Sequence, residues 1–196
     1  EFIFTSSFKI LFLGIFLGTF AGLLIIGSLK LIGAQHNLST KFLINGIIAF
    51  SIANFLGRLF WGFMSDKIGA NLCIFAALLL QGTSIISLNI SLTEFSYLII
   101  SFLIGFGFGG NFSLFAKETA AIFGVEKMGI IYPYVFLGYA IAGLLGPVSG
   151  GYLYDTANTF TYSILLASLM SFLGSIIYLI QHIKEIKVKR TSNLQS

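Results

Sequence analysis

One arginine lies in the middle of a long apolar stretch, where a charged side chain is costly. Arg58 precedes Asp66 by eight residues, so on a helix it lies about 12 Å from the charged turn that contains that aspartate. An arginine at the centre of a membrane helix costs roughly +2.5 to +3.5 kcal/mol, and such residues face protein or water and mark substrate pathways. Arg58 is therefore a candidate functional residue.

Helical spacing places small and polar residues on the same face as this arginine. That face consists of Ser51, Asn54, Arg58, Gly62 and Ser65. Leu56, Phe60 and Phe63 point the other way. We therefore expect the arginine face to meet a cavity or another helix rather than lipid.

The elements that position this face are membrane helices. Hydrophobic residues make up 57% of the chain and charged residues 9%, with a mean hydropathy of +0.97, unlike a soluble globular domain. The apolar runs are continuous rather than alternating, which favours helices over a closed barrel. The predicted fold is an all-α membrane protein with six transmembrane helices, at residues 9–29, 41–64, 72–90, 96–116, 129–152 and 159–181.

The basic residues are unequally divided between the two sides of these spans. Eight lie on one side, whereas only Lys30 and Lys41 lie on the other. The positive-inside rule then predicts that both termini are cytoplasmic, in a multi-pass protein of the plasma membrane, the inner membrane in a bacterium. This topology explains the net charge of +4 without a nucleic-acid partner. The basic segment 184–190 is either an ordinary anchor or a contact for anionic lipid.

The charge distribution divides the chain into three parts. We expect residues 1–8 to be the end of a cytoplasmic loop (the central loop, if the chain is half of a larger carrier), residues 9–181 the transmembrane unit, and residues 182–196 a basic cytoplasmic tail. We predict no cofactor or metal, because Cys73 lies alone in a span and His36 and His182 lie on opposite sides. No nucleophile, base or ligand cluster converges, so we do not expect an enzyme.

Small residues recur at helical intervals within the spans, which lets membrane helices approach closely. The first span contains Gly14, Gly18 and Gly22, and the fourth contains Gly105, Gly109 and Ser113. The motif in the fifth span consists of Gly138, Ala142, Gly146, Pro147, Gly150 and Gly151. Two uses remain open, namely packing alone or surfaces that slide during rocking motions.

Several motifs resemble those of the major facilitator superfamily. The loop signature of that family, G-x-x-x-D-[RK]-x-G, is matched by Gly62-x-x-x-Asp66-Lys67-x-Gly69, although Ala70-Asn71 follows where basic residues are usual. The fifth-span motif resembles the glycine-proline signature of antiporters. The oxalate/formate antiporter group, and more loosely the monocarboxylate transporters, are similar in the pattern Asn54-x-x-Gly57-Arg58-x-x-x-Gly62-x-x-Ser65-Asp66, with Gly109-Gly110 and Phe123-Gly124-x-x-x-x-Gly129.

The resemblance implies a fold and a function. The chain would be the C-terminal six-helix half of a twelve-helix carrier that moves a small organic anion by alternating access, with the N-terminal half as its missing partner. A start at Glu1 rather than Met, with no signal peptide before the first span, agrees with a piece of a longer protein. Arg58 would take the substrate carboxylate, with Asn54 orienting it, while Asp66 and Lys67 would be gate residues whose partners lie in the other half.

Two departures from the group narrow the substrate. Oxalate carriers are expected to have a lysine in the penultimate helix, but span 129–152 contains no lysine or arginine, and Tyr132 and Tyr139 stand on one face there. A substrate with two negative charges would meet only the one positive charge of Arg58, which favours a monocarboxylate. Proton-coupled carriers tend to have an aspartate where this chain has Asn54. The residues Asn111, Tyr134 and Thr19 either line the cavity or pack within the bundle.

Two alternatives remain open at this point. The chain can be a truncated or split-gene remnant that inserts into the membrane and acts only as an interaction module. Arg58 can also brace the inner gate, by bonding to backbone carbonyls or Asp66, instead of binding substrate.

Overall fold

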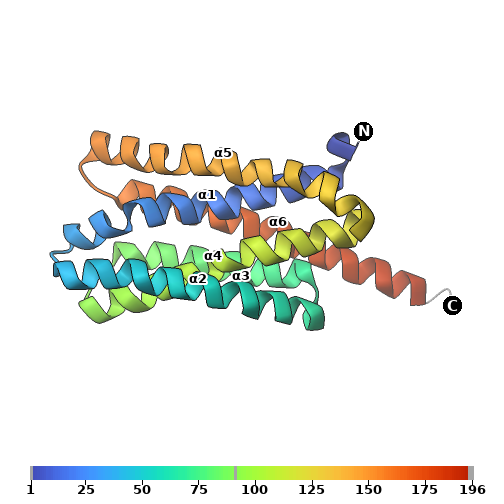
Figure 1. Ribbon diagram of the computed structural model, residues 1–196, viewed down its shortest axis with the longest axis horizontal. Helices are drawn as coiled ribbons and strands as arrows, with labels where there is room; N and C mark the ends of the chain where they lie inside the picture. The colour runs from blue at the N-terminus through green and yellow to red at the C-terminus, as the bar shows by residue number, and fades with distance from the viewer. Residues whose placement is uncertain (1, 91, 194–196) are drawn as a thin grey trace.

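A computed structural model describes residues 2–90 and 92–193 and consists of long helices that run side by side (Figure 1). The six helices are Ser6–Gln35 (α1), Thr40–Ile68 (α2), Ala70–Ile86 (α3), Glu94–Phe123 (α4), Val125–Ala157 (α5) and Thr161–Asn193 (α6). Short 3₁₀ turns occupy Phe2–Phe4 and Ser87–Asn89. All six helices are long and apolar enough to cross a membrane. The predicted six-helix, all-α membrane fold is confirmed for the described residues.

The helix contacts show an internal symmetry between α1–α3 and α4–α6. If α1, α2 and α3 are matched with α4, α5 and α6, the main contacts of the first half correspond to those of the second. α2 packs mainly on α4, α1 mainly on α5, and α3 on α6. Such internal repeats are typical of membrane carriers. Both chain termini lie at one end of the bundle, which we call the inner end (Figure 1). The turns α2–α3 and α4–α5 lie at the same end.

Five of the six helices are longer than the predicted spans. α1 continues to Gln35 and α5 to Ala157, so the first and last outer connections are shorter than expected. α3 is the exception, because it ends at Ile86 and a 3₁₀ turn follows at Ser87–Asn89. α6 continues to Asn193, so residues 182–193 extend this helix rather than form a separate tail. Apolarity marks the part of a helix inside the hydrocarbon, whereas a solvated polar turn can continue the same helix beyond it. Residues 1, 91 and 194–196, and the side chains of 188–190 in the basic segment, lie outside the described part of the chain.

Two single glycines join consecutive helices at the inner end. Gly69, between α2 and α3, has φ +88° and ψ 152°, and Gly124, between α4 and α5, has φ +85° and ψ 149°. Only glycine adopts this region without strain. The N–H groups of these glycines still donate to the carbonyls of Ser65 and Ala120. Each glycine therefore reverses the chain within one residue and fixes the inner ends of its two helices.

The small residues of α1 receive large side chains from α4. A Cβ atom on Gly14 would overlap the ring of Phe115, and one on Gly22 would overlap the ring of Phe108. Between them, Gly18 faces Asn111. These contacts place α1 and α4 in the interior of the bundle.

The fifth-span motif lies mostly against α1. Residues at four-residue intervals are buried there, namely Gly138, Ala142, Gly146 and Gly150. A Cβ atom on Gly146 would lie 3.1 Å from the Phe20 carbonyl oxygen. Pro147 lies at the edge of this contact, beside Gly27. Gly151 is not part of it, because this residue is exposed and has no neighbour within 4 Å.

Candidate functional site

Arg58 is positioned by backbone contact between α2 and α4. A Cβ atom on Gly57 would overlap the Phe106 carbonyl, and one on Gly109 would overlap the Asn54 carbonyl. The Gly109 position is also only 3.0 Å from the backbone nitrogen of Arg58. Helices approach this closely only where side chains are absent. The residue about one turn beyond Gly109 on α4 therefore comes directly beside the arginine side chain.

That neighbour is Phe112, and the Arg58 guanidinium lies over its ring. The Arg58 Cζ atom lies 4.1 Å from the centroid of the ring, a cation–π geometry. Arg58 Nε also donates a hydrogen bond to Asn54 Oδ1 at 3.3 Å. The two contacts hold one face and one edge of the guanidinium. No acidic side chain of the described residues forms an ion pair with Arg58, so the remaining N–H groups can bind an anion.

The arginine face of α2 flanks the helix contact instead of forming its centre. The buried centre of that contact includes Phe50, Gly57 and Trp61, and Trp61 Nε1 donates to the Phe106 carbonyl at 3.0 Å. Arg58 is exposed on the surface of this bundle. The arginine face thus lies beside the contact between α2 and α4, and its expected meeting with a cavity or another helix stays a prediction at Arg58.

Aromatic side chains of α4 and α5 surround the arginine. We call Phe112, Tyr132, Phe136 and Tyr139 the aromatic cluster. Ring centroids are 5.4 Å apart for Phe112 and Tyr139, 4.8 Å for Phe136 and Tyr139, and 5.7 Å for Tyr132 and Phe136. The Tyr132 hydroxyl donates to the Phe112 carbonyl at 3.4 Å. All four side chains are half-buried, so the cluster forms an apolar wall beside a cation.

The structure thus brings Tyr132 and Tyr139 against Phe112, the ring that contacts Arg58, and it adds two residues that sequence reasoning missed. Phe112 and Phe136 are two of 22 phenylalanines in the chain. Their composition and spacing do not separate them from lipid-facing residues. The only useful signal was the position of Phe112 three residues after Gly109, because that glycine marks the close contact with α2.

Asn111 does not belong to this surface. Its side chain is 2% exposed and points into the bundle, where Nδ2 donates to the Phe108 carbonyl at 3.1 Å and to Gln81 Oε1 at 3.5 Å. Gln81 in turn donates to the Gly18 carbonyl. Consecutive helical residues diverge by about 100°, so Asn111 and Phe112 face different partners. Of the two roles left open for Asn111, packing within the bundle agrees with these hydrogen bonds, and its proposed substrate contact stays a prediction.

The two further cavity candidates lie elsewhere. The Thr19 hydroxyl is buried and donates to the Ile15 carbonyl within its own helix. Tyr134 is exposed, and its ring packs 5.5 Å from that of Phe2. Neither residue extends the surface around Arg58.

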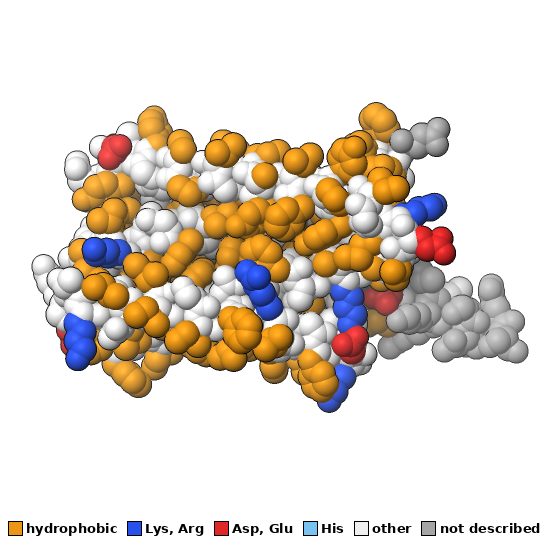
Figure 2. Space-filling model, in the orientation of Figure 1, with side chains coloured by type: hydrophobic (Ala, Val, Ile, Leu, Met, Phe, Trp, Pro, Cys, Tyr) orange, Lys and Arg blue, Asp and Glu red, His pale blue; other side chains and the backbone are white. Residues whose placement is uncertain are grey.

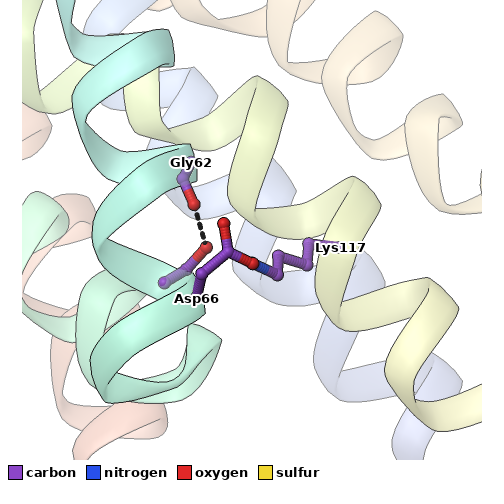
Figure 3. Close-up of polar contacts among 4 residues, drawn as sticks. Gly62, Asp66 and Lys117 are labelled. Atoms are coloured by element: carbon purple, nitrogen blue, oxygen red, sulfur yellow. Dashed lines mark hydrogen bonds and ion pairs between the residues drawn. The ribbon is translucent and has the colours of Figure 1, made fainter.

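At the inner end, Asp66 of α2 forms an ion pair with Lys117 of α4 (Figure 3). The hydroxyl of Ser65 donates to the Gly62 carbonyl at 2.7 Å (Figure 3). Lys67 instead lies over the Phe63 ring, 4.4 Å from its centroid. The sequence assigned the partners of the loop motif to another half of the carrier, but Asp66 has one within this bundle. The sequence analysis did not predict this role for Lys117, because it used the residue only to infer the membrane topology.

The surface supports placement in a membrane. Figure 2 shows hydrophobic side chains along the broad side of the bundle and charged ones mainly at its two ends. A single basic side chain interrupts the middle of that face. This chain is a multi-pass membrane protein, consistent with its six apolar helices.

Comparison with known proteins places the chain in a family. It is 25% identical to the oxalate:formate antiporter of Oxalobacter formigenes over 144 residues, which are 72% of this chain and 34% of that protein. It is 32% identical to human monocarboxylate transporter 14 over 83 residues, which are 42% of this chain and 16% of that protein. The MFS-type transporter YhjX of Escherichia coli (strain K12) is 27% identical over 126 residues, or 63% of this chain and 31% of that protein. The matched parts of the chain thus span 16% to 34% of the length of these relatives.

The family model agrees with these relatives and covers nearly all of the described helices. It matches residues 11–195 and describes membrane transporters rather than enzymes. The chain belongs to the Major Facilitator Superfamily.

Proposed function

We propose that this chain is the C-terminal half of a secondary carrier that moves a small monocarboxylate by alternating access. The observation that carries the proposal is that Arg58 is held in place but has no acidic partner among the described residues. Its guanidinium is held by Phe112 and Asn54, while no acid of the described residues neutralises it. A preorganised, uncompensated guanidinium in an apolar setting is a strong carboxylate receptor.

A single negative charge fits this surface better than two. The residues around Arg58 are aromatic or neutral, and α5, which supplies three of them, has no lysine or arginine beyond its first turn. A dianion here would keep one carboxylate without a cation, which is costly where water is scarce. Two relatives are named after carboxylates, namely the oxalate:formate antiporter and monocarboxylate transporter 14.

The missing N-terminal half would cover the side of the bundle that carries the site. α2 and α5 are the most exposed helices and present large apolar side chains, among them Phe55, Leu59, Leu137, Leu144 and Val148. Carriers of this kind bind substrate near the midplane between their repeats. In this arrangement the inner end, with most basic residues, faces the cytoplasm, and the membrane is the inner membrane of a bacterium.

The test is equilibrium binding of a labelled monocarboxylate to purified full-length protein. Arg58→Lys keeps the charge but loses the planar fork, so we expect affinity to fall at least about tenfold, the equivalent of one lost charged hydrogen bond. Arg58→Gln should abolish binding without harming insertion, because it removes a charge from the membrane. Lys41→Gln, an exposed basic residue at the other end of α2, is the matched control.

The alternative role for Arg58 gives a different result. If it only braces the inner gate, Arg58→Lys will bind the labelled acid with unchanged affinity but transport it slowly. That outcome would remove the substrate-site assignment. Absence of any carboxylate binding by the unmodified full-length protein would favour the non-transporting interaction module.

A further inference from the structure

A small, partly closed cavity, here called the enclosed cavity, lies at the inner end, apart from the surface around Arg58. α1, α3, α4 and α6 all contribute to it. Its volume is about 60 Å³, which is room for a small ion with one or a few waters. The walls are partly apolar, but five polar side chains line it, namely Ser7, Asn71, Glu118, Tyr178 and Gln181.

Glu118 is the acidic group of this cavity, and its carboxylate is nearly inaccessible. The residue is 8% exposed. The Asn71 side chain lines the same cavity and donates from Nδ2 to Glu185 Oε2 at 3.3 Å. A neutral amide is therefore the neighbour that Glu118 and Glu185 share at this place. In the loop signature, basic residues are usual at the positions that Ala70 and Asn71 occupy here. The carboxylate of Glu118 therefore faces a neutral amide where a basic side chain would be expected.

The basic residue that lines the neighbouring cavity is already paired. A second, more open cavity of about 440 Å³ adjoins the first, and Asn71 and Glu118 line both. Lys117 lines the open cavity, but its ammonium group pairs with Asp66. None of the described residues that line the enclosed cavity is basic. Glu118 therefore has little compensation inside it.

The Tyr178 hydroxyl is a second, independent sign of a ligand. Tyr178 is 1% exposed, and its hydroxyl has no hydrogen-bond partner among the described residues. The ring is fixed by an edge contact with Phe115 at 5.5 Å and by Gly14 beside it, so the hydroxyl cannot turn away to solvent. Buried polar groups in folded proteins are nearly always paired. Something that fills the cavity should complete this one.

We propose that the cavity binds one small monovalent cation, sodium, between Glu118, Tyr178 and Asn71. Its polar lining offers oxygen atoms, which are the ligands of hard cations. Among the described residues that line this cavity, Glu118 is the one carboxylate, so one positive charge balances it. Asn71 donates to Glu185 from Nδ2, which leaves its amide oxygen for the ion, and the open cavity provides the entry from the inner end. A proton on Glu118 would neutralise the same charge, so the experiment has to separate the two.

The experiment compares sodium with an inert cation on the purified full-length protein. Thermal unfolding is followed in NaCl and in choline chloride at equal ionic strength and pH, and sodium binding is measured by titration calorimetry. Sodium should raise Tm in a saturable way. Glu118→Gln should abolish this rise, and Tyr178→Phe should weaken sodium binding about fivefold, as expected for loss of one ligand hydroxyl. Glu126→Gln, an exposed acid at the same end, should leave it unchanged.

The unmodified protein alone can overturn the proposal, whether or not the variants fold. Equal Tm in sodium and choline means that no sodium site exists. Stabilisation by lower pH without any sodium effect means that Glu118 holds a proton instead. A loss of the sodium effect in Glu126→Gln as large as in Glu118→Gln means a general charge effect. None of these results depends on carboxylate binding at Arg58.

Discussion

The Arg58 side chain owes its orientation to two neighbours of different chemistry. Asn54 holds one N–H group at 3.3 Å, and Phe112 supports the flat face of the guanidinium. A flexible side chain that is ordered before binding loses less entropy when the ligand arrives. If Arg58 binds the proposed anion, the asparagine and the ring would raise affinity without touching it.

Phe112→Leu should weaken monocarboxylate binding about threefold to fivefold, since an exposed cation–π contact contributes about 0.5–1 kcal/mol. Leucine keeps the position apolar, so folding should be preserved. The measurement is the dissociation constant of the full-length carrier. Phe102→Leu is the matched control, because Phe102 also lies on α4 but stacks on Phe106. Equal losses in both variants would show that the ring acts only through packing.

At the level of the helices, their number and approximate positions were readable from the sequence. Continuous apolar runs require helices in lipid, and the structure has one for each predicted run. The helix ends were not readable, because the chain outside the hydrocarbon remains helical without an apolar signal. The small-residue motifs predicted close contact but not the partner, since Gly109 meets α2 whereas Gly18 meets α4 itself. Partner choice depends on three-dimensional packing that spacing along one helix does not contain.

Gly146→Leu should disturb the contact between α5 and α1. Even a Cβ atom there lies 3.1 Å from the Phe20 carbonyl oxygen, and larger groups in a packed site cost about 1–3 kcal/mol. We expect a lower Tm and impaired uptake. Gly151→Leu is the control, because nothing lies within 4 Å of that position. Normal uptake and Tm for Gly146→Leu would show that this part of α5 is not packed as described.

The turn glycines give a second test at this scale. Gly69→Ala and Gly124→Ala place a side chain in backbone conformations at φ +88° and +85°, which should cost about 1–3 kcal/mol each. There is open space around both residues, so any loss must come from the backbone. Gly129→Ala, inside α5 with no neighbour within 4 Å, should keep or slightly raise Tm. The check is thermal unfolding of the three variants, and an unchanged Tm for Gly69→Ala would contradict the described turn.

For the whole molecule, the candidate site was only partly predictable. Arg58 was identifiable because a charge in an apolar helix is expensive, and Tyr132 and Tyr139 because they replace an expected lysine. Phe112 and Lys117 were not, since their roles arise only when α4 is laid against α2. The interior position of Asn111 likewise depends on which side of α4 meets Gln81.

The orientation of the bundle gives a prediction for the intact membrane. Asn37 lies at the outer end and Lys127 at the inner end, in agreement with the helix order. Single cysteines at these positions, in a Cys73→Ser background, should react with an impermeant maleimide from opposite sides, with Lys127→Cys reached only from the cytoplasm. Cys73 is buried, so its replacement should not disturb labelling. Reaction of both cysteines from one side would exclude this topology.

The glycine-mediated contact between α2 and α4 also limits how the protein can move. Because the two backbones touch at Gly57, Gly105 and Gly109, we expect α2 and α4 to move together as one rigid body. Arg58 and the Asp66–Lys117 pair both belong to this rigid body and lie about 12 Å apart along α2. A movement of the inner end should therefore also move Arg58, the proposed anion-binding residue, without a rearrangement between the two positions. Spin labels placed on α2 and α4 should report one fixed separation throughout a transport cycle, while distances to the other half change.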